Sequence, residues 1–221
     1  MTFQELCNAV MLKATGKATI LSPDNAKWKK ILGIANLYQN AWLNEPGQKW
    51  NSRYDRAYEV GSISDEDAYE LDETIEEIST ARGDQIYIET EDGNRIKYDL
   101  VDYDDLQNYP AGKYCAVVGN NLVFNHTFDE ESPEYGGTIF APVYLGIEEL
   151  TGKDDDIVVD NPYWLVTICA AEYIRNDIVK QNQYGNLMAE ANNLMTSMIR
   201  HNRGGQVRKI RGSWRNPGGL N

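Results

Sequence analysis

The spacing of the hydrophobic residues changes twice along this chain, and this change constrains the fold more than any other sequence feature. Before Pro46 and after Asn161, these residues recur every three or four positions, as on the buried face of an α-helix. From Tyr54 to Leu145, short β-like runs lie between turn residues. We therefore predict an α+β protein in which the N- and C-terminal helices form one helical bundle and the β-rich segment is an insertion into it.

The predicted organisation has four segments. Residues 1–53 supply the first helices of the bundle, 54–145 the β-rich insertion, 146–202 the C-terminal helices and 203–221 a basic, flexible arm. The expected helix signals are a capping box at Thr2 and Glu5, starts at Ser22-Pro23 and Asn161-Pro162, and ends at Gly16, Pro46-Gly47 and, between the last two helices, Gly185.

Two β-hairpins are predicted in the middle of the chain. The first has Glu91–Asn94 as its turn, between Ile86–Glu89 and Arg95–Tyr98, and the second has Gly119–Asn121 between Tyr114–Val118 and Leu122–Phe124. A helical turn is expected at Thr74–Ile78 and a short helix at Asp104–Asn108.

Charged residues are distributed unevenly in this chain of net charge −13. Between Glu59 and Asp105 there are 17 acidic and three basic residues, whereas after Glu190 there are six basic residues and no acidic one. This separation predicts an acidic body with a cationic arm. A body of that charge repels nucleic acid rather than binding it.

The cysteines and the apolar runs indicate the compartment. Cys7, Cys115 and Cys169 are odd in number and lie among apolar neighbours, which is typical of buried free thiols in a reducing environment. The chain starts without a basic region leading into an apolar run, and its longest strongly apolar stretch, Trp164–Ala171, is too short to span a bilayer. We expect neither secretion nor membrane insertion.

Motifs of known catalytic chemistry are missing from the sequence. We find no phosphate loop, dinucleotide fingerprint, nucleophile elbow or cysteine–metal spacing. His126 with the acidic residues Asp129–Glu131 could bind a divalent cation, but acidic loops of this kind are usually just solvated. We therefore expect no enzyme, no catalytic residue, no metal site and no cofactor.

The cationic arm has a recognisable binding chemistry, because arginine pairs with carboxylates in a bidentate manner and stacks on aromatic rings. Docking on a protein partner suits the acidic body better than binding nucleic acid, although a nucleic-acid-binding tail and a merely solvated tail remain alternatives. The residues expected to dock are Arg203, Arg208, Lys209, Arg211, Trp214 and Arg215.

Aromatic residues with a polar group are numerous: 14 Tyr and five Trp against four Phe. Such side chains suit surfaces that become half-buried between subunits, with compositional drift as the alternative explanation. The residues expected to serve subunit packing are Tyr163, Trp164, Trp28 and Trp42.

The order of these segments resembles the head-to-tail connector proteins of tailed bacteriophages, including the tail tubular protein A type. The most specific stretch runs from Asn161 through Tyr163-Trp164 to Arg175 and resembles the aromatic-rich entry into that family's long C-terminal helix. Leu187–Asn202 resembles the helix before its tail, and the two predicted hairpins resemble its paired strands in placement. The acidic stretch 59–77 has no counterpart that we can align.

This resemblance implies a structural virion protein, a subunit of a ring of about twelve copies that lines the DNA channel below the portal. Its arm would dock on the portal protein, and a tail or nozzle protein would attach to the opposite side. Genomic DNA would pass without sequence-specific contact, and assembly would take place in the host cytoplasm. A neck or tail-completion protein is the closest alternative, and a small nucleic-acid-binding module is the alternative of another class.

Overall fold

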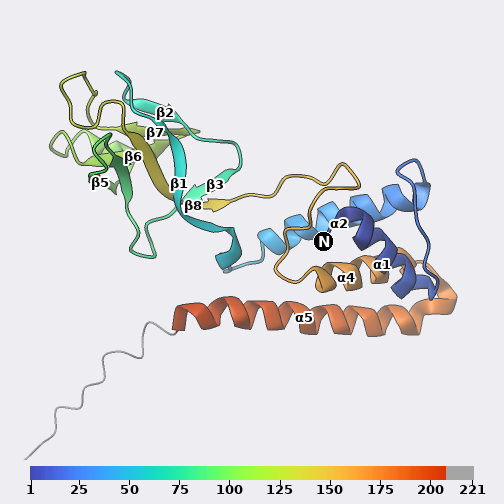
Figure 1. Cartoon of the computed structure of the whole chain (residues 1–221). Coiled ribbons are helices and arrows are strands. Elements are labelled where there is room, and N and C mark those ends of the chain that lie inside the picture. Colours follow the sequence, from blue (N-terminus) through green and yellow to red (C-terminus); the bar gives the residue numbers. More distant parts are fainter. Residues whose placement is uncertain (208–221) are drawn as a thin grey trace, which may run out of the picture. The chain divides into compact units, whose positions relative to one another are not determined.

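The computed structural model of the 221-residue chain describes residues 1–207 (Figure 1). It divides into two compact units. The helical unit comprises Met1–Asn51 and the chain from Ile147 onward, and the β unit comprises Ser52–Gly146.

Four helices make up the described part of the helical unit: α1 (Phe3–Thr15), α2 (Ala26–Leu43), α4 (Pro162–Ile174) and α5 (Gln181–Val207). The predicted capping box is confirmed, since Thr2 Oγ1 accepts the backbone N–H of Glu5 while the Glu5 carboxylate accepts the backbone N–H of Thr2. The helix start at Asn161-Pro162 and the helix end at Gly16, whose φ is 72°, are confirmed as well.

Two of the predicted helix boundaries are wrong. Asn25, not Ser22, is the N-cap of α2, because its side chain accepts the N–H of Lys27 while Ser22 lies in the turn before it. Helix α5 continues through Gly185 without a break. A single glycine costs a helix only about 1 kcal/mol, and packing of α5 against α4 offsets that cost.

Helix α4 is at the centre of the helical unit, where it contacts α1, α2 and α5 (Figure 1). Nine of its 13 residues are buried, in agreement with its apolar character on all sides. Within residues 1–207, none of the helices combines the length and the apolarity needed to cross a bilayer.

Aromatic pairs fix α1, α2 and the segment after α2 in this core. Phe3 of α1 meets Trp28 of α2 edge to face, with ring centroids 4.9 Å apart. Trp42 stacks on Trp50 at 4.6 Å, and Trp50 Nε1 donates to the carbonyl oxygen of Trp42.

The loop before α4 caps the N-terminus of α1. The backbone N–H groups of Phe3 and Gln4 donate to the carbonyl oxygens of Asp155 and Lys153 at 2.8 and 3.0 Å. These N–H groups have no partner inside their own helix, so the loop satisfies them. The acidic turn around Asp155 is therefore a structural part of the helical unit.

Eight strands form the sheet of the β unit: β1 (Tyr54–Ser62), β2 (Ala68–Glu70), β3 (Ile75–Ile78), β4 (Ile86–Glu89), β5 (Arg95–Leu100), β6 (Tyr114–Val118), β7 (Asn121–Phe124) and β8 (Thr138–Leu145). Their order is β1-β8-β4-β5-β6-β7-β2, with β3 pairing β8 beside this path. Every pair is antiparallel except β5 with β6.

Strand β8 organises this sheet. One of its edges pairs with β1 along its whole length, and the other pairs first with β4 and then with β3. Register shifts in β1 bend the strand. The sheet curls into a half-barrel whose end strands β1 and β2 are in contact.

Both predicted hairpins are confirmed, as β4–β5 and β6–β7. A short helix, α3 (Tyr103–Leu106), lies near the position expected from Asp104–Asn108. The predicted helical turn at Thr74–Ile78 is wrong, because Ile75–Ile78 is strand β3. The hydrophobic residues of this four-residue segment show no clear helical or strand periodicity, so pairing with β8 decides its conformation.

The predicted fold class, a helical bundle with a β-rich insertion, is wrong. The chain is a mixed α/β protein whose large curled sheet encloses its own hydrophobic core, with Ile86, Ile88, Tyr98 and Leu122 fully buried in it. Each strand is short and irregular, so the sequence pattern of any one strand predicts an insertion on the surface of the bundle rather than part of a sheet with its own core. Curling lets them enclose a core together, and no single strand pattern reveals this.

Candidate functional site

Of the expected docking arm, only its first residues fall in the described structure. Arg203 is exposed on α5, which continues to Val207, so the chain is helical where the arm was predicted to begin. Arg208, Lys209, Arg211, Trp214 and Arg215 lie outside the described residues.

Three of the four side chains expected in subunit packing are enclosed within the helical unit itself. Trp28, Trp42 and Trp164 are at most 4% exposed. Tyr163 is 52% exposed, so it is the member of this group that presents substantial surface.

Tyr163 is held in place by Lys13, whose ammonium group joins three helices. It donates to Tyr163 Oη at 2.8 Å and to Thr167 Oγ1 at 2.9 Å on α4. It also pairs with Glu190 of α5 at 2.8 Å. Sequence spacing gave no sign of this contact, because its partners are at least 150 residues from Lys13.

His126 lies in an aromatic cluster of the β unit. Its ring stacks on Tyr98 and meets Phe128 edge to face, with centroids 6.1 and 4.5 Å away. Burial lowers the pKa of His126, which the carboxylate of Glu134 partly offsets. The neighbouring Asp129 accepts hydrogen bonds from its own loop, chiefly from the Ser132 hydroxyl, which lowers its pKa.

Residues 1–207 contain no cluster of metal ligands, and their three cysteines are buried. In this part of the chain, no three His, Cys, Asp or Glu side chains are grouped so that they could hold a metal ion. Cys7, Cys115 and Cys169 are buried free thiols, as predicted. Burial raises the pKa of Cys7 and Cys115 to about 12 and raises that of Cys169 as well, so these thiols stay protonated at neutral pH.

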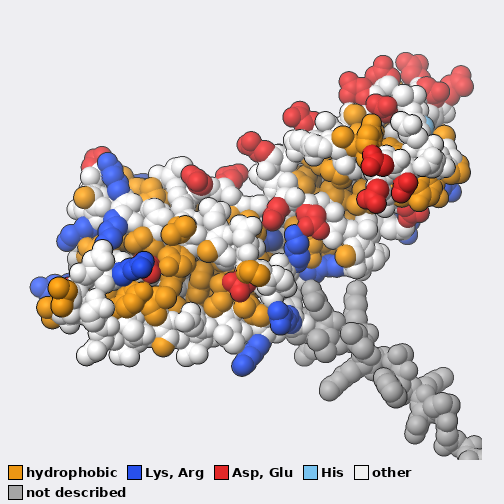
Figure 2. Space-filling view, turned by 180° about the vertical axis from the view of Figure 1, so that it is seen from behind, with side chains coloured by type: hydrophobic (Ala, Val, Ile, Leu, Met, Phe, Trp, Pro, Cys, Tyr) orange, Lys and Arg blue, Asp and Glu red, His pale blue; other side chains and the backbone are white. Residues whose placement is uncertain are grey.

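The structure separates charge by unit more sharply than the sequence suggested. The β unit has 22 acidic and six basic side chains, a net charge of −16. The helical unit up to Val207 has 12 acidic and 11 basic side chains. Figure 2 shows the acidic side chains gathered over the β unit and many of the cationic ones over the helical unit.

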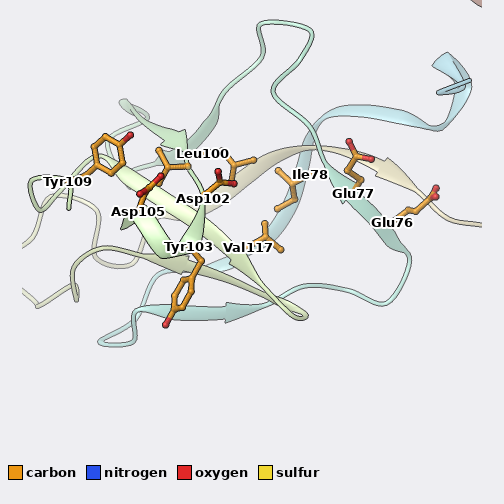
Figure 3. Close-up of a pocket in the computed structure, with 10 residues that line it drawn as sticks. Glu76, Glu77, Ile78, Leu100, Asp102, Tyr103, Asp105, Tyr109 and Val117 are labelled. Atoms are coloured by element: carbon orange, nitrogen blue, oxygen red, sulfur yellow. The ribbon is translucent and has the colours of Figure 1, made fainter. Parts of the chain in front are cut away.

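A groove of about 600 Å³ opens on the β unit, and sequence reasoning missed it (Figure 3). It is lined by the end of β3, the connection from β5 through α3, and Tyr109 and Val117. Figure 3 shows Ile78 and Val117 between Asp102 on one side and Glu77 on the other. The acidic runs were visible in the sequence, but only the sheet pairing brings β3 beside α3.

The groove combines carboxylates with exposed apolar surface. Glu76, Glu77, Asp102 and Asp105 supply the charge, and all four are exposed. Tyr103, Tyr109 and Val117 are 49%, 40% and 39% exposed. Such a surface can bind a cationic, partly aromatic segment without covalent chemistry.

Comparison of the chain with family models and with curated proteins finds no match. The function is therefore inferred from the residues of this chain and their geometry.

Proposed function

We propose that the chain is a structural subunit of the head-to-tail connector ring of a tailed bacteriophage, joining the portal to the tail. The observation that carries this proposal is the separation of charge between a β unit of −16 and a C-terminal segment with only basic charges. A channel for DNA needs walls that repel phosphate, and an attachment to a protein partner needs a separate cationic contact.

The end of α5 supports a role for the cationic segment in attachment. Asn202 is buried, accepts the backbone N–H of Asn51 at 2.9 Å and donates to the carbonyl oxygen of Lys49. These hydrogen bonds hold the helix firmly within the helical unit. The segment that begins six residues later starts from a fixed point, which lowers the entropy cost of docking.

In the proposed particle about twelve copies form the ring, and passing genomic DNA makes no sequence-specific contact with them. The arm meets the portal, and a tail or nozzle protein attaches on the other side. A neck or tail-completion protein would differ mainly in which of these partners it touches.

Deletion of Gln206–Asn221 tests the proposal in an assembly reaction with portal-bearing heads. The deletion starts after Asn202, the last described residue that is buried, so the helical unit should stay folded. We expect the truncated chain to fail to join the heads in sedimentation and electron microscopy, because it lacks the cations that pair with the portal. Normal attachment of the truncated chain would contradict the docking role.

Charge reversal provides the matched control. Reversal of Arg208, Lys209 and Arg211 should weaken attachment in a salt-sensitive way, with the largest defect at low salt, where charge interactions are least screened. The same reversal at Lys17, Lys27 and Lys29, which are exposed on the helical unit, should leave attachment unchanged. Tight binding of the intact chain to free duplex DNA at physiological salt would instead favour the nucleic-acid-binding module.

A further inference from the structure

The groove on the β unit has the features of a preformed binding surface. Tyr109, on one of its walls, stacks on Tyr114 with ring centroids 4.4 Å apart, so its orientation is set before any ligand arrives. Val117 projects from strand β6 and is supported by its pairing with β7. A fixed apolar surface binds at a smaller entropy cost than one that must first become ordered.

The charge of the groove selects a cationic ligand. Its four carboxylates come from two elements, Glu76 and Glu77 from β3 and Asp102 and Asp105 from the region of α3. Asp102 is at the N-cap position of α3, yet its side chain makes no capping hydrogen bond in the described structure. Arg53 lies close enough to interact with Glu76, but this guanidinium donates to the carbonyl oxygens of Leu145 and Gly146.

The chain itself contains a segment of the complementary composition. Arg208–Asn221 has four cations and one tryptophan, with no acidic residue. Arginine can pair with the carboxylates and stack on the tyrosines, and a tryptophan suits the apolar centre of the groove. Fourteen residues reach at most about 50 Å when extended.

We propose that the groove binds the segment Arg208–Asn221 of a second copy of the chain. A contact between two different surfaces is heterologous, and a heterologous contact is the kind that generates a ring when its rotation closes. This inference rests on the proposed connector function and names the contact that links neighbouring copies before the portal is present. Docking of the same segment on a portal then requires it to leave the groove.

A binding measurement with a synthetic peptide of residues 208–221 tests the groove directly. The chain truncated after Val207 presents the groove, and we expect saturable binding that weakens as salt is raised. The double substitution Asp102→Asn and Asp105→Asn should weaken binding about tenfold. Asparagine retains the size of aspartate, so this variant tests charge with little effect on folding.

Glu130→Gln with Glu131→Gln is the matched control, since both residues are exposed on the same unit and outside the groove. It removes the same charge and should leave peptide binding unchanged. An equal loss of peptide affinity in the two double variants would show that the peptide responds only to the overall charge of the β unit, which would overturn the proposal. So would the absence of peptide binding.

Mixing two defective chains tests the contact between copies. One chain lacks Arg208–Asn221, and the other is full-length with Asp102→Lys and Asp105→Lys. We expect each to be monomeric alone and the mixture to form a one-to-one complex in sedimentation velocity, since the first supplies a groove and the second a segment. If the unmodified chain stays monomeric at concentrations where the peptide saturates the groove, the segment does not act between copies.

Portal attachment distinguishes this inference from the proposed function. The lysine variant of the groove keeps its segment, so it should still join portal-bearing heads while the truncated chain does not. If both the truncated chain and the lysine variant attached to the heads, the docking role of the segment would be refuted. Peptide binding alone would then decide whether the groove binds the segment.

Discussion

At the scale of single residues, two polar side chains have surroundings that local sequence does not reveal. Lys13 is held by Tyr163, Thr167 and Glu190 from two other helices. His126 is in the opposite situation, because its Nδ1 is buried without a hydrogen-bond partner in the described structure. Protonation would place a positive charge in a partly buried site where Nδ1 has no acceptor and the Glu134 carboxylate offsets the effect of burial only in part.

The β unit should therefore lose stability when His126 is protonated. The folded-state pKa of His126 lies below its ordinary value of 6.5, so the unfolded chain binds the proton more readily. Stability should be complete above about pH 6.5 and fall as pH drops toward the lowered pKa. We expect the free energy of unfolding to decrease as pH falls below about 6.5, above the range where most carboxylates titrate.

Denaturant unfolding across this pH range, followed by hydrogen exchange in the strands, measures the effect. His126→Phe should flatten the dependence, whereas His201→Gln, an exposed position on α5, should not change it. A slope that is the same in the chain with His126 and in the phenylalanine variant would contradict the prediction.

At the scale of elements, strand β8 depends on the glycine that precedes it. A Cβ atom at Gly137 would lie 2.8 Å from the carbonyl oxygen of Glu89 and 2.9 Å from that of Glu134. Backbone atoms cannot move aside without displacing β4 from β8. The close approach of β4 and of the turn that begins at Glu134 therefore requires glycine at this position.

Gly137→Ala should destabilise the β unit by about 1–3 kcal/mol, the usual cost of overpacking a buried site. Gly61→Ala is the control, because Gly61 lies in β1 and a Cβ there would meet nothing within 4 Å. Urea unfolding of the two variants gives the comparison. A Gly137 variant as stable as the Gly61 variant would show that the strands adjust freely.

At the scale of the whole molecule, residues 1–207 form two hydrophobic cores with no buried residue in common. Trp164→Ala should cost the helical unit about 3–5 kcal/mol, because the side chain is buried among the helices. Its effect should be confined to that unit, with strand amides keeping their protection in hydrogen exchange. Gly137→Ala should show the reverse pattern, and equal loss of protection in both units would mean that they unfold as one.

The negative charge of the predicted acidic body is concentrated in one of the two units. Most of the acidic residues belong to the β unit, and the helical unit up to Val207 is nearly neutral. The sequence placed the acidic run Glu59–Asp105 within the predicted β-rich segment, and the structure adds that the helical unit is nearly neutral.

The sequence by itself determined the local features of this protein. The capping box at Thr2, the start at Asn161-Pro162 and both hairpins could be predicted, because contacts within a few residues decide them. Buried cysteines and the apolar helix α4 could be predicted too, since cysteines among apolar neighbours and a helix apolar on all sides are usually buried.

Only the tertiary structure decided the features that depend on contacts between distant segments. The pairing of β3 with β8, the independent core of the sheet and the partners of Lys13 join residues far apart in sequence. The groove between β3 and α3 exists only because the sheet curls and brings two acidic runs together. The local conformational preferences of residues cannot specify these contacts, because the contacts stabilise the fold only after distant segments of the chain have come together.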